Sequence, residues 1–403
     1  MTLKFKWETE FKETEIGEIP IPEDWEEKRL EIYKIQYGKG LPENQRKKGD
    51  IPVVGSSGIL GYHNKALAKS PGIIIGRKGN IGSVYFSKKD FFPIDTVFYI
   101  ENLPSIEIAK YLYYTISQYD FNQLMSDSAV PGLNINILKN ATIPFPSPEE
   151  QTRISTILSY FDDLIENKKK QNEILEKTAM AIFKSWFVDS ISKENELKKE
   201  WEIKPLKEIA QLIKGVSYNS PNITEEPVGD LFITLKNFFR CGGFKTEYKF
   251  YVGDKAKEEQ KVNDGDLIIA LTDMTPLAQV VGAPAIVVLP FGYTGGIISL
   301  DCAKLNVSNE NLRYYLYLSL KHLQEENSTF ANGSNVLHLN TDLFMENKII
   351  PIPPDNMLED FHNKIKPLFQ KIILNQKEIM VLRQVRDVLL PLLVFGKLRV
   401  EEM

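Results

Sequence analysis

Two long amphipathic segments, one in the middle of the chain and one at its end, constrain the fold more than any other feature. The first runs from Ser147 to Phe187 and opens with Ser147-Pro-Glu-Glu150, a helix-capping sequence with proline in the first turn. Apolar residues then recur at steps of three and four, as on a helix with one buried face: Ile154, Ile157, Leu158, Phe161, Leu164, Ile165, Ile174, Leu175 and Ile182. Such a helix would measure about 60 Å. We therefore expect it to pack against a partner of similar length.

That partner is predicted in the same chain. The segment from Asp355 to Phe395 repeats the pattern at a constant offset, because Phe161 and Phe369 are 208 positions apart, as are Phe187 and Phe395. A proline-rich strand precedes each segment, and two similar sequences beginning with tryptophan open the two halves, Trp25-Glu-Glu-Lys-Arg-Leu and Trp201-Glu-Ile-Lys-Pro-Leu. The sequence therefore predicts a tandem duplication in which a globular domain precedes each long helix, with the two helices forming an antiparallel coiled coil.

The repeat predicts seven segments. They are an extended N-terminal segment (1–22), a first domain (23–146), a first long helix (147–187), a linker (188–200), a second domain (201–353), a second long helix (354–396) and a C-terminal tail (397–403). The polar middle of the first helix, Asn167-Lys-Lys-Lys-Gln-Asn172, is expected to be partly exposed.

Both domains are predicted to be mixed α/β (α+β). Short β-branched or aromatic runs bounded by Gly, Pro or Asp indicate strands in each domain. In the first domain these are Ile51-Pro-Val-Val, Gly72-Ile-Ile-Ile-Gly, Gly82-Ser-Val-Tyr-Phe and Asp95-Thr-Val-Phe-Tyr-Ile. In the second they are Leu231-Phe-Ile-Thr-Leu, Asp266-Leu-Ile-Ile-Ala-Leu, Ala285-Ile-Val-Val-Leu and Gly296-Ile-Ile-Ser-Leu. One helix is expected in each domain, over 106–117 and 308–323.

The composition of the sequence argues against several classes of protein. The two cysteines lack any metal-ligand spacing, and the four histidines form no HxH or HExxH pair, so no disulfide framework or metal site is indicated. The N-terminus lacks the apolar core of a signal peptide, and no apolar run is long enough to span a bilayer. We therefore expect a cytoplasmic protein without a membrane partner. The net charge of −5 neither announces nor excludes nucleic-acid binding, which depends on a local basic face.

Two glycine-containing loops of the first domain are candidate binding elements. Arg77, Lys78 and Asn80 lie in Gly76-Arg-Lys-Gly-Asn-Ile-Gly82, which could present cations and backbone N–H groups to a phosphate. Ser56, Ser57 and Tyr62 lie in Gly55-Ser-Ser-Gly-Ile-Leu-Gly-Tyr62, where Ser can bond a phosphate or a base edge. The residues alone favour a turn that needs glycine for each loop, and for the Arg77 loop the turn and the binding interpretation are compatible.

The comparable positions in the second domain are Lys236 and Asn237, within Thr234-Leu-Lys-Asn237, and Thr272 and Asp273, just past an apolar strand. The latter pair could bond a ligand. Alternatively, Asp273 could cap the turn that ends the strand.

No catalytic signature accompanies these loops. The sequence contains no Walker A or dinucleotide motif, no adenine-methylation motif, no helicase set and no arrangement of nucleophile and base. We therefore predict a chain that is not catalytic by itself and binds no cofactor of its own.

The order of these motifs resembles the specificity subunit of type I restriction–modification systems. The resemblance rests on Ile16-Gly-Glu-Ile-Pro…Asp24-Trp25, on the two glycine loops, on Ile143-Pro-Phe-Pro-Ser-Pro-Glu-Glu-Gln151 and on Gly265-Asp-Leu-Ile-Ile-Ala-Leu-Thr-Asp-Met-Thr275. It covers nearly the whole chain. The second helix departs from the pattern, because Pro353-Pro-Asp-Asn-Met-Leu-Glu359 stands where Glu-Glu-Gln would be expected.

The resemblance implies two target-recognition domains held apart by the helices, each binding half of a split site in double-stranded DNA. It implies two methyltransferase subunits that use S-adenosylmethionine, and two motor–nuclease subunits that use ATP and Mg²⁺ could join them. The ten candidate residues named above would then contact DNA. Two other classes stay open: a coiled-coil scaffold with two protein- or peptide-binding domains, and an enzyme whose glycine loop binds a nucleotide.

Overall fold

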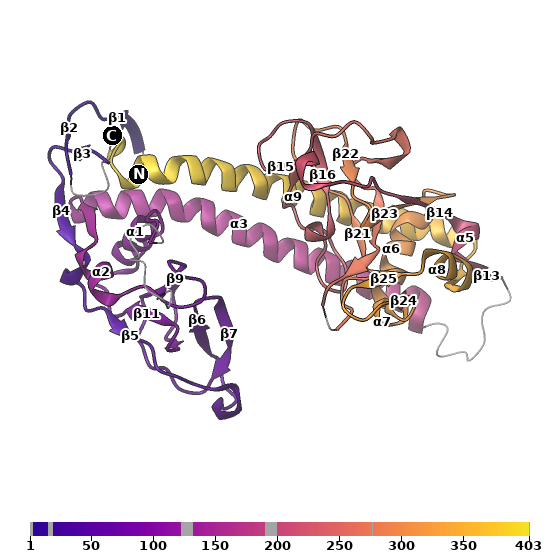
Figure 1. Ribbon diagram of the computed structural model, residues 1–403, viewed down its shortest axis with the longest axis horizontal. Helices are drawn as coiled ribbons and strands as arrows, with labels where there is room; N and C mark the ends of the chain where they lie inside the picture. The colour runs from indigo at the N-terminus through magenta and orange to yellow at the C-terminus, as the bar shows by residue number, and fades with distance from the viewer. Residues whose placement is uncertain (1–2, 15–18, 122–131, 190–199, 276, 403) are drawn as a thin grey trace. The chain divides into compact units, whose positions relative to one another are not determined.

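The computed structural model describes residues 3–14, 19–121, 132–189, 200–275 and 277–402 (Figure 1). The chain forms two compact units: unit 1 comprises Met1–Leu164 and Leu382–Met403, and unit 2 comprises Ile165–Val381. The division runs through both long helices, so each helix contributes residues to both units. The predicted boundaries instead kept the helices, 147–187 and 354–396, as segments separate from the two domains.

The two long helices have the predicted limits. Helix α3 spans Pro148–Phe183 and continues into a π-helical turn over Lys184–Val188, and α9 spans Asp355–Val394. The backbone N–H of Glu150 donates to Ser147 Oγ (3.3 Å), which is the predicted N-terminal cap. Because Gly396 has φ +70°, it ends α9 in the left-handed region that favours glycine.

The pairing of α3 with α9 is antiparallel, as predicted. In unit 2, Lys168 pairs with Glu378, and further along α3 the Asn172 side chain accepts a hydrogen bond from Asn375 Nδ2 (2.9 Å). In unit 1, Arg386 Nη1 pairs with Asp162 Oδ1 at 2.6 Å. Asn167, Lys169, Lys170 and Gln171 are exposed, which confirms the expected exposure of the polar middle.

The first domain, in unit 1, contains two sheets and a helix. One sheet has the order β5 (Gln36–Tyr37), β11 (Val97–Ile100), β8 (Gly72–Gly76), β9 (Val84–Ser87), and the other has the order β10 (Phe92–Pro93), β6 (Ile51–Gly55), β7 (Gly58–His63). Ile73 and Ile75 of β8 pack in one core with helix α1 (Ile106–Ile116), while Ile74 packs in a second core with Val54. Burial of both faces explains the unbroken Ile-Ile-Ile run.

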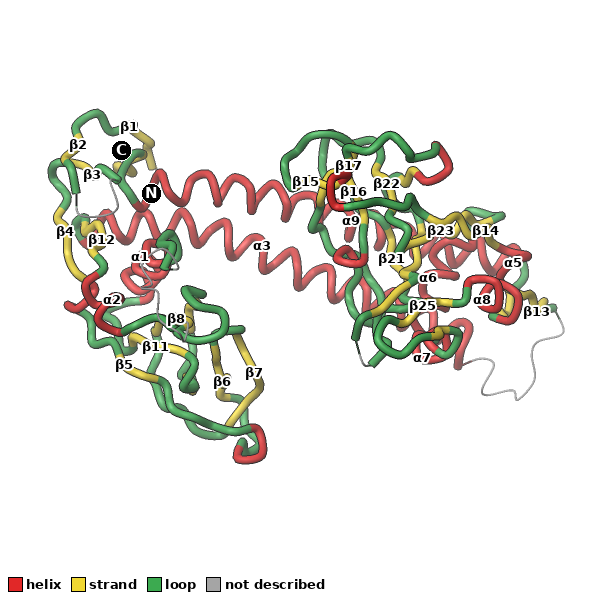
Figure 2. The backbone as a smooth tube through the Cα atoms, viewed as in Figure 1, coloured by secondary structure: helices red, strands yellow, loops and turns green. Residues whose placement is uncertain are grey.

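The second domain, in unit 2, repeats this plan (Figure 2). One of its sheets has the order β14 (Ala210–Lys214), β23 (Cys302–Val307), β19 (Leu267–Ala270), β21 (Pro284–Ile286). The other has the order β15 (Ile223–Thr224), β17 (Lys249–Tyr251), β16 (Asp230–Ile233), β22 (Gly296–Ile298), β18 (Lys261–Val262). Helix α6 (Leu312–His322) occupies the place of α1. The parallel pair β6–β10 of the first domain corresponds to β16–β22. The duplication predicted from the sequence is therefore present in the strand order.

Smaller elements complete each unit. In unit 1 they are β2 (Phe11–Lys12), β3 (Ile21–Pro22), β4 (Glu26–Arg29), β12 (Thr142–Phe145) and α2 (Ile135–Asn140). In unit 2 they are β13 (Glu202–Pro205), α5 (Leu206–Ile209), β20 (Thr272–Asp273), α7 (Gln324–Ser328), β24 (Ala331–Asn332), β25 (Leu337–Leu339), α8 (Thr341–Asn347) and β26 (Ile349–Ile352). The strand preceding each long helix pairs with the strand that opens its domain, β12 with β4 and β26 with β13.

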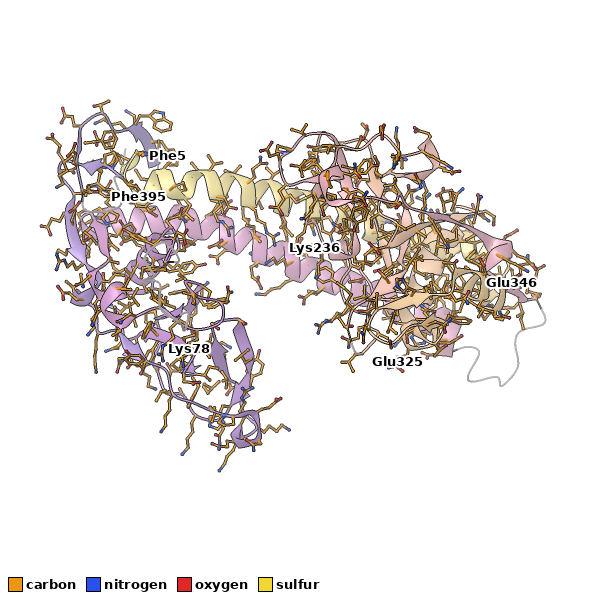
Figure 3. All side chains as sticks on the ribbon, viewed as in Figure 1. Phe5, Lys78, Lys236, Glu325, Glu346 and Phe395 are labelled. Atoms are coloured by element: carbon orange, nitrogen blue, oxygen red, sulfur yellow. The ribbon has the colours of Figure 1, made fainter. Side chains whose placement is uncertain are left out.

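The two ends of the chain form a sheet that the sequence analysis missed. Strand β1 (Leu3–Trp7) pairs antiparallel with β27 (Leu398–Glu402), where an extended segment and a tail were expected. Arg399 of β27 contacts three carboxylates, those of Glu8, Asp24 and Glu150, at 2.6–3.0 Å. Figure 3 labels Phe5 and Phe395 in this region. The chain ends are thereby attached to the first turn of α3.

Candidate nucleic-acid interface

The two glycine loops of the first domain lie against each other. The loop between β8 and β9 carries Arg77, Lys78 and Asn80, and the turn between β6 and β7 carries Ser56 and Ser57. Ser83 Oγ donates to the carbonyl of Ser56 at 2.8 Å, as does the Tyr85 hydroxyl at 3.0 Å. Both loops are hairpin connections, and Gly79 and Gly82 have φ of +73° and +75°. The predicted turn geometry is therefore confirmed.

Arg77 is held in place by aromatic rings. Its guanidinium carbon lies 5.0 Å from the centre of the Tyr37 ring and 5.4 Å from that of Phe98, and Nη1 donates to the Asp95 carbonyl (3.3 Å). Among the described residues, no carboxylate pairs with Arg77 or with the exposed Lys78. This arrangement leaves positive charge available to an anionic ligand.

The other first-domain candidates have different environments. Ser56 is only 6% exposed, and its backbone holds the two loops together, whereas Ser57 and Asn80 are exposed. Tyr62 lies on strand β7 and is 55% exposed. The structure therefore brings the Ser56–Ser57 turn next to the Arg77 loop and places Tyr62 on the adjoining edge strand.

The second-domain candidates occupy the corresponding loops. Lys236 and Asn237 lie between β16 and β17, as Ser56 and Ser57 lie between β6 and β7, and Thr272 and Asp273 follow β19 as Arg77 follows β8. A backbone hydrogen bond from Cys241 N–H to the Gln279 carbonyl (2.7 Å) joins the two loops. Figure 3 labels Lys78 and Lys236, one in each unit.

Three of these four residues are buried and bonded within the domain. Asn237 is 0% exposed, and its side-chain amide accepts from Thr234 N–H and donates to the carbonyls of Lys245 and Glu247. Thr272 Oγ1 bonds Asp301 Oδ1 at 3.2 Å. Lys236 is exposed. Direct contact with a ligand is thus open to Lys236, while the buried residues can act only by shaping the loops.

Asp273 caps its turn, as the alternative interpretation held. Its carboxylate is 1% exposed and accepts from the backbone N–H groups of Thr275 (2.7 Å), Val280 (2.6 Å) and Val281 (3.3 Å). Burial raises the pKa of this carboxyl, but the hydrogen bonds from Val280 and Thr275 outweigh burial and hold the pKa below its ordinary value. An ionised carboxylate therefore holds the backbone at Thr275, Val280 and Val281.

A third element joins the loops in each domain. In the second domain it is the hairpin of β24 and β25, whose turn Gly333-Ser-Asn335 is exposed and whose Leu339 N–H donates to the Leu271 carbonyl (2.8 Å). In the first domain, Leu133 N–H donates likewise to the Arg77 carbonyl (2.9 Å). The sequence analysis missed the hairpin, although Asn332-Gly333 before an apolar strand is a hairpin signal.

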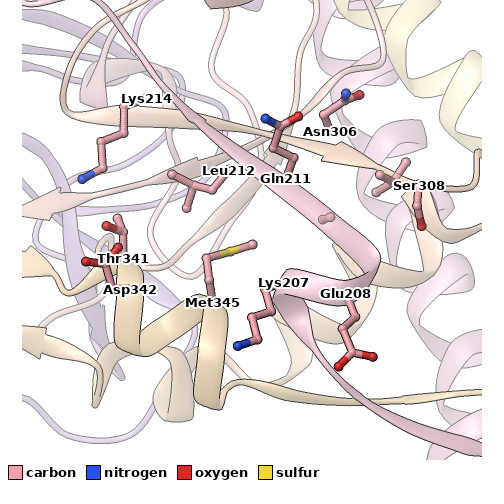
Figure 4. A pocket seen from close by; sticks show the side chains of 12 residues that line it. Lys207, Glu208, Gln211, Leu212, Lys214, Asn306, Ser308, Thr341, Asp342 and Met345 are labelled. Atoms are coloured by element: carbon pink, nitrogen blue, oxygen red, sulfur yellow. The ribbon is translucent and has the colours of Figure 1, made fainter.

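A groove of about 650 Å³ lies on the second domain. It lies among α5, β14, β23 and α8, and its side chains include Lys207, Gln211, Lys214, Asn306 and Asp342 (Figure 4). Lys207 pairs with Glu346 at 3.6 Å, and no histidine or cysteine lines the groove. In the described residues, no three His, Cys, Asp or Glu side chains gather as metal ligands would. Nor does that part of the chain contain a helix long and apolar enough to cross a membrane.

Comparison with known proteins identifies the family. The protein-family model described as type I restriction modification DNA specificity domain matches this sequence twice, over residues 22–177 and 198–384. The type I restriction enzyme MjaIX specificity subunit of Methanocaldococcus jannaschii is 34% identical over 100% of this chain and 99% of its own length. The putative MjaX specificity subunit of the same organism is 28% identical over 99% of each chain.

A solved structure shares the fold. The crystal structure of the type I restriction–modification S subunit from M. genitalium matches with a TM-score of 0.58 at 19% identity, covering 94% of this chain and 96% of that one. The resemblance inferred from the motifs is confirmed, apart from Ile16-Gly-Glu18 of the opening motif, which lies outside the described residues. The chain belongs to the DNA specificity subunits of type I restriction–modification systems.

Proposed function

We propose that each domain binds one half of a split DNA site through its converging loops. In each domain the candidate loops converge into one cluster. The two clusters lie at corresponding positions of the two domains but carry different residues, and this observation carries the proposal. Arg77 and Lys78 in one cluster and Lys236 in the other lack acidic partners among the described residues. Equivalent placement suits a common docking mode on duplex DNA, and different residues suit two different half-sites. In the first domain we propose that Ser56, Ser57, Tyr62 and Asn80 line the same interface, and in the second that Asn237, Thr272 and Asp273 support it.

We further propose that the paired helices set the spacer between the half-sites. Two methyltransferase subunits would dock on the helices and carry out adenine methylation with S-adenosylmethionine. Two motor–nuclease subunits using ATP and Mg²⁺ could join for cleavage. This chain would contribute recognition and no catalytic group. That division of labour is consistent with the absence of a nucleotide or methyl-donor motif from the sequence.

An apolar groove in unit 1 is the docking place that we favour for a methyltransferase subunit. It measures about 500 Å³ and is lined by Phe5, Thr156, Ile157, Tyr160, Phe161, Leu389 and Leu398. Tyr160 is 64% exposed and Phe5 48% exposed, so an apolar helix of a partner could bury both side chains.

The test is to purify the chain with the methyltransferase encoded beside it and to map the adenines that the complex methylates. A bipartite motif with a fixed gap is expected. The groove variant Phe5→Ser/Tyr160→Ser should co-purify with fewer methyltransferase subunits per chain than wild type, whereas Ile174→Ser, which alters an equally exposed residue in the unit 2 part of α3, should leave that ratio unchanged. A wild-type chain that never associates with the methyltransferase would refute the proposed function.

A further inference from the structure

The loop after strand β20 presents an apolar tip that the family assignment leaves unexplained. Met274 is 75% exposed and Leu277 is 74% exposed, the highest values for large apolar side chains among the described residues. The corresponding loop of the first domain instead exposes Lys78 and Asn80. Exposing such side chains to water is unfavourable, which suggests that a ligand covers them.

The backbone around the tip is fixed. The buried Asp273 carboxylate accepts three backbone N–H groups at its base, and Ala278 has φ +49° and donates from its N–H to the Thr275 carbonyl (3.2 Å). On the other side, the Gln279 carbonyl accepts from Cys241 N–H. Because these hydrogen bonds hold the residues on both sides of the tip, less ordering entropy opposes its insertion into a ligand.

Positive charge lies on the loop that contacts the base of the tip. The loop that contacts Gln279 carries Lys236, Arg240 and Lys245, and Lys245 Nζ lies 5.3 Å from the centre of the half-exposed Phe239 ring. None of these three cations forms an ion pair with a carboxylate within the described ranges. Apolar side chains flanked by unpaired cations suit a nucleic acid, whose phosphates border the apolar faces of its stacked bases.

We propose that Met274 and Leu277 form a wedge that enters between two adjacent base pairs of the half-site bound by the second domain. Lys236, Arg240 and Lys245 would hold the flanking phosphates. Unstacking a base step has a free-energy cost that is lowest at flexible pyrimidine–purine steps, so the wedge would favour such a step without bonding any base edge. This inference rests on the proposed DNA-binding function and adds a means of recognition to it.

The test uses the complete methyltransferase complex and its mapped site, with 2-aminopurine placed in turn at each step of the second half-site. Wild type should increase the fluorescence at one step in addition to the adenine that the methyltransferase flips out of the duplex. Met274→Ser/Leu277→Ser should abolish that increase and weaken binding by about 10- to 100-fold, which corresponds to the few kcal/mol of one wedge contact. DNA that lacks the base at that step should restore the affinity of the double variant to within about threefold of the wild-type value, because the unstacking cost is then already absent.

A matched control is Val228→Ser/Val252→Ser. It replaces two exposed apolar residues at the opposite end of β16 and β17 and should leave fluorescence and affinity unchanged. Cys241, the exposed cysteine of the two, supplies a second readout. It should form a disulfide with a thiol-tethered nucleotide next to the step, and not with tethers in the first half-site.

Three results would overturn the wedge while leaving the proposed function intact. The first is a wild-type complex that binds and methylates DNA without unstacking any step apart from the flipped adenine. The second is a double variant that binds DNA normally. The third is a double variant that loses its methyltransferase, which would make the tip a protein contact. A wild-type complex that binds no DNA would remove both proposals.

Discussion

At the scale of single residues, Arg77 combines an unpaired charge with a fixed position. Its guanidinium lies against Tyr37 and Phe98, so a phosphate contact would cost little side-chain entropy. We expect Arg77→Ala/Lys78→Ala to weaken DNA binding by the methyltransferase complex and to lower the slope of log K against log salt by about one to two. The measurement is a binding series across KCl concentrations.

The control for this variant is Lys89→Ala. Lys89 is exposed and lies beyond the opposite end of β9. Its substitution should therefore leave both the affinity for DNA and the slope of log K against log salt unchanged. Undiminished affinity of the double variant at every salt concentration would exclude the Arg77 loop from the interface.

Asp273 gives a pH-dependent prediction. Its pKa is lower in the folded state than in the unfolded chain, so its contribution to stability is present above the unfolded value and is lost as the pH falls through the folded value. Asp273→Asn should lower the free energy of unfolding by about 2 kcal/mol near pH 7, because charge-assisted hydrogen bonds are lost. The difference in Tm between wild type and variant should shrink below about pH 4. A constant difference from pH 7 to pH 3 would contradict this role.

The sequence does not show which side chains around a turn are exposed. Lys236 and Asn237 are neighbours, yet one is exposed and the other is 0% exposed, because a short turn directs Asn237 onto the carbonyls of Lys245 and Glu247. Periodicity does not resolve side-chain direction in a loop. For the same reason the exposure of Met274 and Leu277 was not predicted.

At the scale of elements, the long helices and the buried strands were predictable because each has a periodic or unbroken apolar pattern. The strands β1 and β27 were not, since they are short, lie at opposite ends of the chain and pair only with each other. The burial of Arg399 among Glu8, Asp24 and Glu150 depends on that pairing.

Arg399→Ala should therefore destabilise unit 1. Its side chain is 15% exposed and Glu150 is 6% exposed, so removing the cation leaves a poorly solvated carboxylate at a cost of about 3 kcal/mol. Lys6→Ala is the matched control: Lys6 is the register partner of Arg399 but makes only an exposed ion pair with Glu401, and it should cost less than about 1 kcal/mol. Thermal unfolding of both variants measures the difference, and equal losses would contradict the account.

At the scale of the whole molecule, we propose that the paired helices set the spacing between the half-sites. Removing one heptad from each, residues 166–172 and 374–380, keeps the apolar faces in phase and shortens each helix by about 10 Å. The mapped gap between the half-sites should shorten by about three base pairs, or methylation should be lost altogether. Deleting only 166–172 removes Lys168, the partner of Glu378, and leaves the two helices unequal in length, so it should prevent assembly. A full-length gap after the paired deletion would refute this role of the helices.

The central claim is that each domain reads its own half of the site. The most direct test replaces residues 201–353 with the corresponding domain of another specificity subunit and maps every adenine methylated by the resulting complex. We predict that one half of the methylated motif changes to the half-site of the donor subunit, while the other half and the gap stay as in wild type. A motif that stays wholly unchanged, or that changes in both halves, would contradict it.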